Sequence, residues 1–226
     1  MATDRFNPPL AGRHLEQEKN GELYAARLVI NATRQDNVPS TYVGLLSDIT
    51  EKKQSEEMLW LQANYDALTG LANRNLFRSH LVQAIRHCHR TSGKLALMFL
   101  DLDGFKKVND SLGHNMGDLL LKKVALRLES CIRDTDIAAR LGGDEFTVIL
   151  TEIHHPINVE RIAQNILRTL AEPYELINET ANVSASIGIA FYPIDGLDVE
   201  ELIRNADQAM YIAKQAGKNR YHYCNT

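Results

Sequence analysis

Residues 137–150 read IAARLGGDEFTVIL, two short apolar segments joined by a Gly-Gly-Asp-Glu sequence. The segments Ile137–Leu141 and Phe146–Leu150 have the length and composition of β-strands. The two glycines between them supply the positive φ angles that a tight hairpin requires. This part of the chain therefore predicts a β-hairpin that carries Asp144 at its tip.

A longer apolar segment, Leu95–Leu102 (LALMFLDL), precedes the hairpin and is typical of a strand buried on both faces. Asp101 and Asp103 stand where this strand ends, and in a strand they share one face. If the strand lies beside the hairpin, Asp101 and Asp144 converge. Two carboxylates and a backbone carbonyl suit Mg²⁺, with phosphate oxygens completing its shell. The alternative is that each aspartate only forms a turn or caps a helix.

Helical and strand-like patterns alternate through the rest of the C-terminal two-thirds. We expect helices over residues 73–90, 119–132, 160–171 and 198–215, and a second hairpin from strands 174–177 and 183–191 around residues 178–179. Because strands come in hairpins between helices, the predicted fold class is α+β, with a central, mostly antiparallel sheet flanked by helices.

The composition indicates a globular protein without a basic nucleic-acid footprint. The 226 residues are 44% hydrophobic and 24% charged, with a net charge of -4. The cysteines Cys88, Cys131 and Cys224 are far apart and odd in number, which argues against a disulfide framework or a zinc site. We find no signal peptide and no apolar run near the roughly 20 residues of a membrane span. We therefore expect a cytoplasmic chain, or the cytoplasmic part of a larger, membrane-attached protein.

The first 50 residues predict a small β-structure. After a polar lead, Leu23–Ala32 and Thr41–Leu46 flank a polar turn, which predicts a hairpin with a longer loop. The patterns NGELY and YVGLLSDITEKK resemble the end of a PAS sensor domain. That resemblance implies that residues 1–50 are a C-terminal remnant unable to sense a ligand, and that the chain is a fragment. Residues 51–66 predict a helical linker, either a solvated connector or a signalling stalk that pairs two chains.

Further candidate ligand-binding residues flank the two aspartates. The separated cations are Lys106, Lys214 and Lys218, which beside a metal could neutralise a triphosphate. Asn109 and Asp118, which lie between Lys106 and Lys214 in the sequence, can recognise guanine. A carboxylate accepts hydrogen bonds from the ring N–H and the amino group of this base. The alternatives are solvated surface lysines and residues that cap a helix or suit its first turn.

Four motifs occur in order along this region. They are DALTGLANR at 66–74, DLDGFKKVNDSLGHNMGD at 101–118, RLGGDEF at 140–146 and ADQAMYIAKQAGKNR at 206–220. By these motifs, residues 66–220 resemble the GGDEF family of diguanylate cyclases. The resemblance implies that residues 67–226 form a nucleotidyl-cyclase-like domain, related to ferredoxin-like and palm folds. It also implies the condensation of two GTP into cyclic di-3′,5′-GMP and two pyrophosphates.

The resemblance also implies roles for individual residues. The implied ligands of Mg²⁺ or Mn²⁺ are Asp101, Leu102 through its carbonyl, and Asp144. The implied guanosine-binding residues are Asn109, His114 and Asp118. The implied phosphate-binding cations are Lys106, Lys214 and Lys218. Glu145 is the implied helper in deprotonating the 3′-hydroxyl, although its division of that role with Asp144 is open. Asp144 replaces a common glutamate and Lys218 a common arginine; neither change predicts an inactive enzyme.

The implied chemistry needs a partner and suggests a second site. Each GTP must attack the other's α-phosphate, so two chains must meet face to face in a two-fold homodimer. Arg133 and Asp136 form an R-x-x-D pair shortly before the Gly-Gly turn, which resembles the family's product-inhibition site for cyclic di-GMP. Arg161 is the expected further arginine of that site. The plain alternative is a salt-bridged surface turn.

Two other functions stay open at this point. One is a regulatory module that binds GTP or cyclic di-GMP without turnover and precedes a phosphodiesterase domain. The other is an oligomerisation adaptor driven by the helical stalk. Retention of both acidic residues of the predicted metal site argues against the first. The adaptor would not need the combination of Lys106, Asn109 and Asp118.

Overall fold

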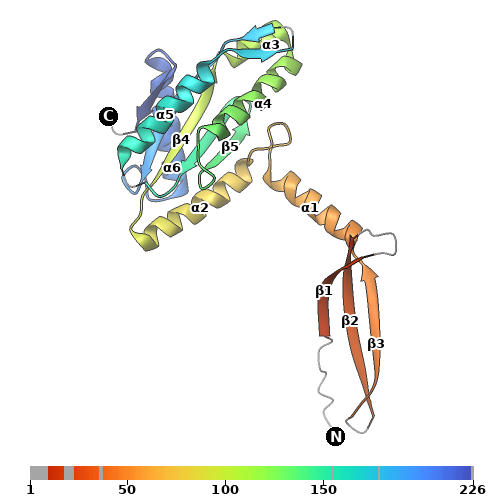
Figure 1. Ribbon diagram of the computed structural model, residues 1–226. Coiled ribbons are helices and arrows are strands. Elements are labelled where there is room, and N and C mark those ends of the chain that lie inside the picture. The colour runs from red at the N-terminus through yellow and green to blue at the C-terminus, as the bar shows by residue number, and fades with distance from the viewer. Residues whose placement is uncertain (1–9, 18–22, 36–37, 154, 178, 225–226) are drawn as a thin grey trace. The chain divides into compact units, whose positions relative to one another are not determined.

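The computed structural model describes residues 10–17, 23–35, 38–153, 155–177 and 179–224 (Figure 1). Parts of the polar lead (residues 1–9 and 18–22), the middle of the predicted N-terminal turn and Asn178 lie outside these residues. The chain divides into two compact units, Met1–Leu61 and Gln62–Thr226. Each unit is described by itself below.

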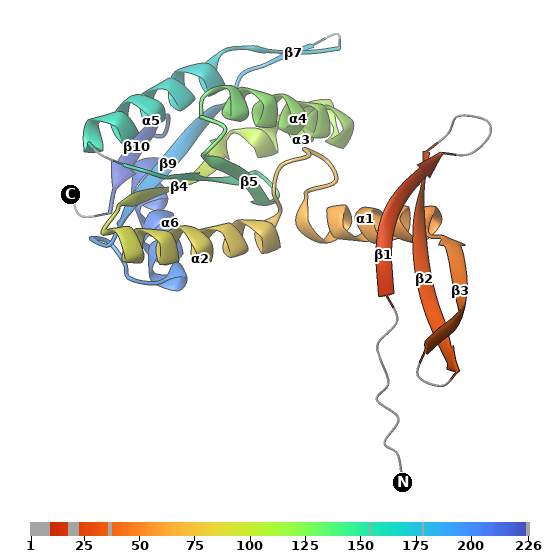
Figure 2. The ribbon, with the colours of Figure 1, turned by 60° about the horizontal axis from the view of Figure 1, so that its bottom comes forward.

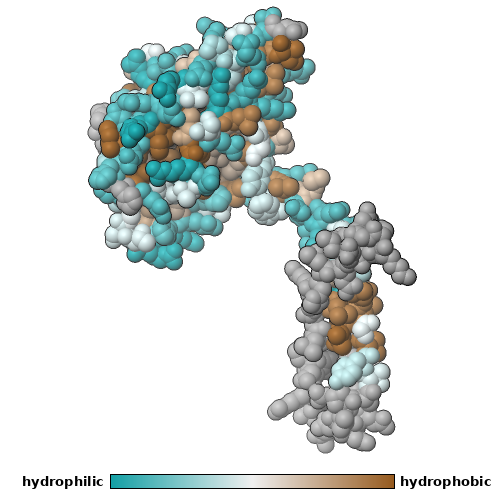
Figure 3. All heavy atoms as spheres, viewed as in Figure 1, coloured by the Kyte–Doolittle hydropathy of each residue, from teal (hydrophilic) through white to brown (hydrophobic). Residues whose placement is uncertain are grey.

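The N-terminal unit contains an antiparallel sheet of order β1-β2-β3, formed by Leu10–Gln17, Leu23–Gln35 and Val38–Asp48. The pairing of β2 with β3 confirms the predicted hairpin. Strand β1 was missed because its sequence, LAGRHLEQ, lacks the β-branched and aromatic residues typical of strands. On β3 the large side chains of Tyr42, Val43, Leu45 and Leu46 are exposed. Figure 3 shows hydrophobic residues at the surface of this unit.

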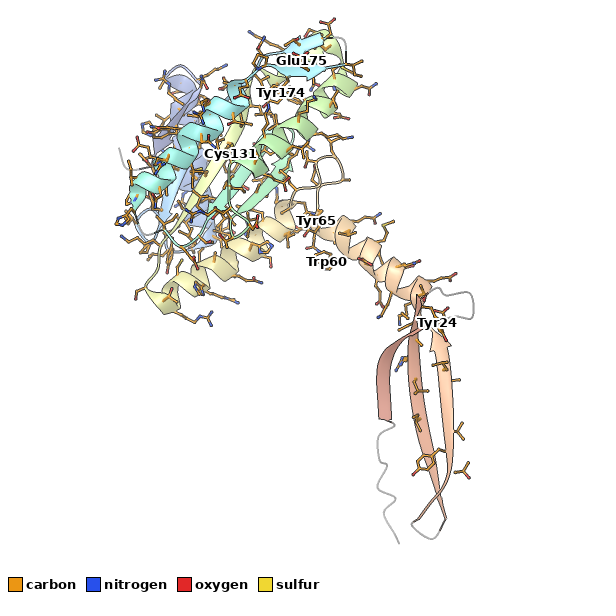
Figure 4. All side chains as sticks on the ribbon, in the orientation of Figure 1. Tyr24, Trp60, Tyr65, Cys131, Tyr174 and Glu175 are labelled. Atoms are coloured by element: carbon orange, nitrogen blue, oxygen red, sulfur yellow. The ribbon has the colours of Figure 1, made fainter. Side chains whose placement is uncertain are left out.

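Helix α1 spans Thr50–Asn64 and confirms that the segment predicted as a linker is helical. Its start is fixed by the Thr50 amide, which donates to Asp48 Oδ1 at 2.8 Å, and by Thr50 Oγ1, which accepts from Ala25 N at 3.0 Å. None of its side chains is buried, and Leu59 and Trp60 are more than half exposed. Trp60 is labelled in Figure 4. None of the described helices is long and apolar enough to cross a membrane.

The C-terminal unit is built on a five-stranded sheet of order β10-β9-β4-β6-β5. Its strands are β4 Leu95–Asp103, β5 Ile137–Gly142, β6 Glu145–Leu150, β9 Ser184–Tyr192 and β10 Arg220–Tyr223. Strand β10 runs parallel to β9, and the other neighbours are antiparallel. This mixed, mostly antiparallel sheet confirms the predicted α+β class.

Helices cover both faces of this sheet (Figure 2). They are α2 Arg74–Thr91, α3 Phe105–Leu112, α4 His114–Ser130, α5 Pro156–Ala171 and α6 Val199–Gln215. Successive side chains of β4 point to opposite faces of the sheet, which divides the core into two clusters. Met98 and Leu100 pack in one cluster with α4 and α5. Leu97 and Phe99 pack in the other with α2 and α6. The prediction that this strand is buried on both faces is confirmed.

The predicted second hairpin is wrong. Strand β7, Tyr174–Leu176, pairs with β8, Glu179–Ala181, and β9 pairs instead with β4 and β10. The physical reason is burial: β9 is apolar enough to lie inside the main sheet, where almost all of its residues are buried. Helix α3 was missed, and α4 begins earlier than predicted, because Gly113, at φ 85°, separates two helices within one polar stretch.

Candidate functional site

The Gly-Gly-Asp-Glu sequence forms the turn between β5 and β6, as predicted. Gly142 and Gly143 have φ angles of 143° and 53°, and a residue with a side chain rarely adopts the first of these. Arg140 holds the turn from inside the hairpin, because its Nε and Nη2 donate to the Gly143 carbonyl at 3.0 and 2.8 Å. The turn presents Asp144 and Glu145, both half-buried, at one edge of the sheet.

The end of β4 lies directly beside this turn. Asp101 is the cross-strand partner of Glu145, and the Leu102 amide donates to the Asp144 carbonyl at 3.3 Å. The predicted convergence of Asp101 and Asp144 is therefore present. Burial raises the pKa of the Asp101 carboxyl, and the negative charge of Asp144 raises it further, while a hydrogen bond from Lys214 partly opposes both.

Lys214 joins this pair from α6. Its Nζ lies 2.7 Å from Asp101 Oδ2, and the side chains are 30% and 14% exposed. Lys218 lies in the turn after α6 and Lys106 lies on α3, and both are exposed. Among the three predicted phosphate-binding lysines, the structure thus brings Lys214 into direct contact with a predicted metal ligand.

The residues predicted to read guanosine lie on α3 and α4. Asn109 comes from α3, and its Oδ1 is buried without a hydrogen-bond partner among the described residues. A methyl group in place of the Gly117 hydrogen would lie 1.8 Å from that oxygen, so only glycine allows this approach. His114 begins α4 and Asp118 lies one turn later, and both side chains are exposed.

An ion pair that was not predicted from the sequence links the 66–74 motif to the signature turn. Arg140 Nη1 donates to both carboxylate oxygens of Asp66, at 3.0 and 3.2 Å. Thr69 donates to the same carboxylate through its amide and hydroxyl. Burial alone would raise the pKa of Asp66, but these hydrogen bonds outweigh it and hold that pKa below its usual value. Both residues lie in quoted motifs, yet no local pattern reveals a partner so distant in sequence.

Arg74 forms a second set of contacts that was not predicted from the sequence. Its Nη2 lies 3.7 Å from Glu145 Oε2 and donates to the Leu141 carbonyl at 3.4 Å. The side chains of Arg74 and Glu145 are 59% and 41% exposed, so solvent screens their attraction and the pair adds little stability. The pair places the Arg74 guanidinium beside Glu145, the residue predicted to help deprotonate the 3′-hydroxyl.

Arg133 of the R-x-x-D pair lines a separate pocket of about 700 Å³ between the end of α4 and α5. Arg133, Arg161 and Arg168 line it together with Cys131, labelled in Figure 4. Its described lining contains no carboxylate. Asp136 is not among the lining residues, since its carboxylate accepts from the amides of Arg133 and Thr151 at 3.2 Å each.

A larger cavity of about 840 Å³ lies along α2, and none of the predicted site residues lines it. The candidate site is instead the acidic sheet edge beside α3 and α6. A mostly antiparallel sheet with helices on both faces and acidic residues at a Gly-Gly turn is the arrangement expected of a GGDEF domain.

The chain belongs to the family described as diguanylate cyclase, GGDEF domain, whose pattern matches residues 63–220. One relative is the bifunctional diguanylate cyclase/cyclic di-GMP phosphodiesterase MucR of Pseudomonas aeruginosa, 46% identical over 75% of this chain and 24% of that protein. The chain spans about a quarter of the length of the first curated relatives it matches.

Solved structures agree. The GGDEF domain of TpbB from Pseudomonas aeruginosa has a TM-score of 0.70 and 39% identity, over 71% of this chain and 94% of that one. The coiled coil and GGDEF domain of DgcB from Caulobacter crescentus, solved in complex with c-di-GMP, has a TM-score of 0.71 and 26% identity, over 77% and 93%.

Proposed function

We propose that this chain is a diguanylate cyclase that condenses two GTP molecules into cyclic di-3′,5′-GMP and releases two pyrophosphates. The observation that carries the proposal is the meeting of Asp101, Asp144 and Lys214 at one edge of the sheet. Two neighbouring acidic side chains with a lysine against one of them suit a cation and the phosphates of a nucleotide.

The donor set fits Mg²⁺ or Mn²⁺. Asp101, Asp144 and the Leu102 carbonyl offer oxygen ligands, which these ions prefer. The raised pKa of Asp101 reflects a burial and a repulsion that a bound cation would relieve. Among the described residues, no group of three or more Asp, Glu, His or Cys side chains is placed to hold a metal ion. In the proposed site, phosphate oxygens of the substrate would complete the shell. When bound, the ion would supply Lewis-acid polarisation of the phosphate and orientation.

The chain's own residues hold the substrate. The proposed guanosine-binding residues are Asn109, His114 and Asp118, and the proposed phosphate-binding residues are Lys106, Lys214 and Lys218. The buried, unpartnered Oδ1 of Asn109 supports this assignment, because the exocyclic amino group of guanine could donate to it. Asp118 favours guanine over adenine, which offers no matching pair of donors.

The chemical step is a displacement at the α-phosphorus. The 3′-oxygen of one GTP bonds to that atom in the other GTP, and the bond to pyrophosphate breaks. The proton of the 3′-hydroxyl leaves to Glu145, with Asp144 as the other candidate acceptor. Positioning and electrostatic stabilisation by the lysines carry most of the acceleration.

The reaction requires two chains, so we propose a two-fold homodimer as the working unit. Residues 67–226 would be the catalytic domain and residues 51–66 the linker. The exposed apolar side chains of Leu59 and Trp60 support the paired-stalk form of that linker. Residues 1–50 would be the C-terminal part of a PAS-like domain, for which the antiparallel sheet β1–β3 is the support.

We also propose that the arginine pocket is the product-inhibition site. Arg133 and Arg161 line it, as the resemblance leads one to expect, and guanidinium groups bind phosphates and the guanine Hoogsteen edge. Asp136 would act on this site by fixing the backbone of Arg133, since it accepts the amide of that residue.

The test is a turnover assay with GTP and Mg²⁺, with products separated by chromatography. Wild type should form cyclic di-GMP, and Asp144→Asn should lower the rate by about a hundredfold through loss of a metal-binding oxygen. The matched control is Asp134→Asn, an exposed aspartate before β5, which should leave the rate unchanged. Equal rates in wild type and Asp144→Asn would refute the assignment.

A second candidate function is a regulatory module that binds GTP or cyclic di-GMP without turnover. It is favoured by two relatives that are named only as cyclic di-GMP phosphodiesterases, NbdA of Pseudomonas aeruginosa and PdeR of Escherichia coli, 44% and 41% identical over 71% and 77% of this chain. Nucleotide binding in the absence of any product would support this alternative.

A further inference from the structure

A second aspartate at the end of β4 has no role in the reaction above. Asp103 is only 8% exposed, and its carboxylate accepts three hydrogen bonds. Ser186 Oγ donates to Oδ1 at 2.9 Å, Ser184 Oγ donates to Oδ2 at 2.8 Å, and the Asn219 amide donates to Oδ2 at 3.2 Å. The carboxylate thus joins β4, β9 and the turn that follows α6.

That turn has an unfavourable backbone. Gly217, Lys218 and Asn219 have φ angles of 116°, 63° and 46°. For residues with a side chain, this left-handed region costs about 1–2 kcal/mol each. The Lys218 amide donates to the Ala213 carbonyl at 3.2 Å, and the Asn219 amide donates to Asp103. Without the Asp103 contact, Asn219 would lose a hydrogen bond that offsets its backbone cost.

We infer that Asp103 is a positioning residue, whose carboxylate holds the turn after α6 in the conformation that aims Lys218 at the nucleotide phosphates. The inference rests on the proposed function, in which Lys218 binds phosphate. Lysine carries its charge on a flexible stem, so the direction of its reach is set by its backbone. The two serine hydroxyls anchor the carboxylate to β9, which makes the tether rigid.

The competing explanation is that Asp103 only stabilises the fold. A matched control exists at the opposite end of β9, where Asp195 is 7% exposed and accepts the Phe191 amide at 2.7 Å. Asp195→Ala also removes a buried carboxylate that accepts a backbone amide, but it leaves the turn with Lys218 untouched. A purely structural role predicts the same consequences for both variants.

The experiment measures binding of two probes by calorimetry in the presence of Mg²⁺. One is the non-reacting analogue α,β-methylene-GTP, which carries all three phosphates, and the other is GMP. Asp103→Ala should weaken the analogue about tenfold, the scale of one hydrogen bond to a charged group, and leave GMP nearly unchanged. Asp195→Ala should leave the ratio of the two affinities at the wild-type value.

A double-mutant cycle then identifies the route of the effect. If Asp103 acts through Lys218, adding Asp103→Ala to Lys218→Ala should weaken the analogue little further. Equal losses for both probes, no loss, or additive losses in the double variant would each overturn the inference. Asp103→Asn keeps the size and one acceptor oxygen, so it should show a smaller loss with the same selectivity even if the alanine variant does not fold. An asparagine variant without that selectivity would also overturn the inference.

The wild-type result separates this inference from the proposed function. If wild type binds neither probe, the proposed function fails and the inference fails with it. If wild type binds the analogue but Asp103→Ala and Asp103→Asn show no selectivity, the inference alone fails.

Discussion

Replacing Lys214 by methionine tests the electrostatics of the acidic sheet edge. Lys214→Met keeps a long, unbranched side chain but removes the positive charge that contacts Asp101 at 2.7 Å. Asp101 then remains 14% exposed beside Asp144 without that cation. We expect the variant to fold and to be less stable than wild type at neutral pH.

The magnitude follows from burial. Removing one partner of a fully buried ion pair costs about 3–5 kcal/mol. Here the lysine side chain is 30% exposed, so water can solvate part of the remaining charge. We therefore expect a loss of about 2 kcal/mol in the free energy of unfolding. The double variant Asp101→Asn, Lys214→Met should recover most of this loss, because no uncompensated carboxylate remains at position 101.

The pH dependence has a definite sign. Because the pKa of Asp101 is raised in the folded state, the fold favours its protonated form. The stability linked to this carboxyl is therefore full below its unfolded pKa of about 3.9 and is lost as the pH rises through the folded pKa. Lys214→Met removes an interaction that lowers this pKa, so the difference from wild type should be small near about pH 4 and largest at neutral pH.

Urea unfolding followed by far-UV circular dichroism measures these differences. The control is Lys122→Met on the exposed surface of α4, where a change within about 0.5 kcal/mol is expected. If Lys214→Met unfolds at the same urea concentration as wild type at neutral pH, the electrostatic reasoning is refuted. It is equally refuted if removing the Asp101 charge restores nothing.

Three further outcomes follow from the geometry. Arg140→Ala should cost about 2 kcal/mol in urea unfolding, because it removes charged hydrogen bonds to Asp66 and the signature turn. Since the pKa of Asp66 is lowered in the folded state, its stabilisation is lost as the pH falls through that pKa, so this cost should shrink in acid. Gly117→Ala should push Asn109 out of place, costing about 1–3 kcal/mol in thermal unfolding and weakening GMP binding in calorimetry. Arg161→Ala should weaken cyclic di-GMP binding about tenfold in calorimetry and leave the turnover rate at low product unchanged; a loss of turnover with intact product binding would reverse that assignment.

Much of the sheet could be predicted from local pattern. The run Leu95–Leu102 is apolar enough to require burial on both faces, and the two glycines before Asp144 fit a tight turn. These features place Asp101 and Asp144 together once the strands are neighbours, as the register confirms. The pairing of β7 with β8 could not be predicted, because it depends on the position of β9, which pairs with β4 in the main sheet and not with β7.

The supporting contacts of the site were harder to foresee. Asp103 looks like Asp101 in the sequence, yet its surroundings differ because β9 supplies two hydroxyl donors only to Asp103. Arg140 pairs with Asp66, which is distant in sequence, and the partner of a charged residue at this separation can be identified only from the folded structure. Residues that contact a ligand come in recognisable motifs, whereas residues that hold them in place depend on tertiary packing.

The most direct test of the central claim is the initial rate of cyclic di-GMP formation from GTP and Mg²⁺ as a function of protein concentration. Since two chains must meet to form one catalytic unit, the rate should rise with about the square of concentration when the dimer is scarce. Adding an excess of Asp144→Asn chains should lower the rate of a fixed amount of wild type, because mixed dimers lack one acidic ligand. A rate that is linear throughout and unaffected by the variant, or no product at high concentration, would contradict the dimeric cyclase.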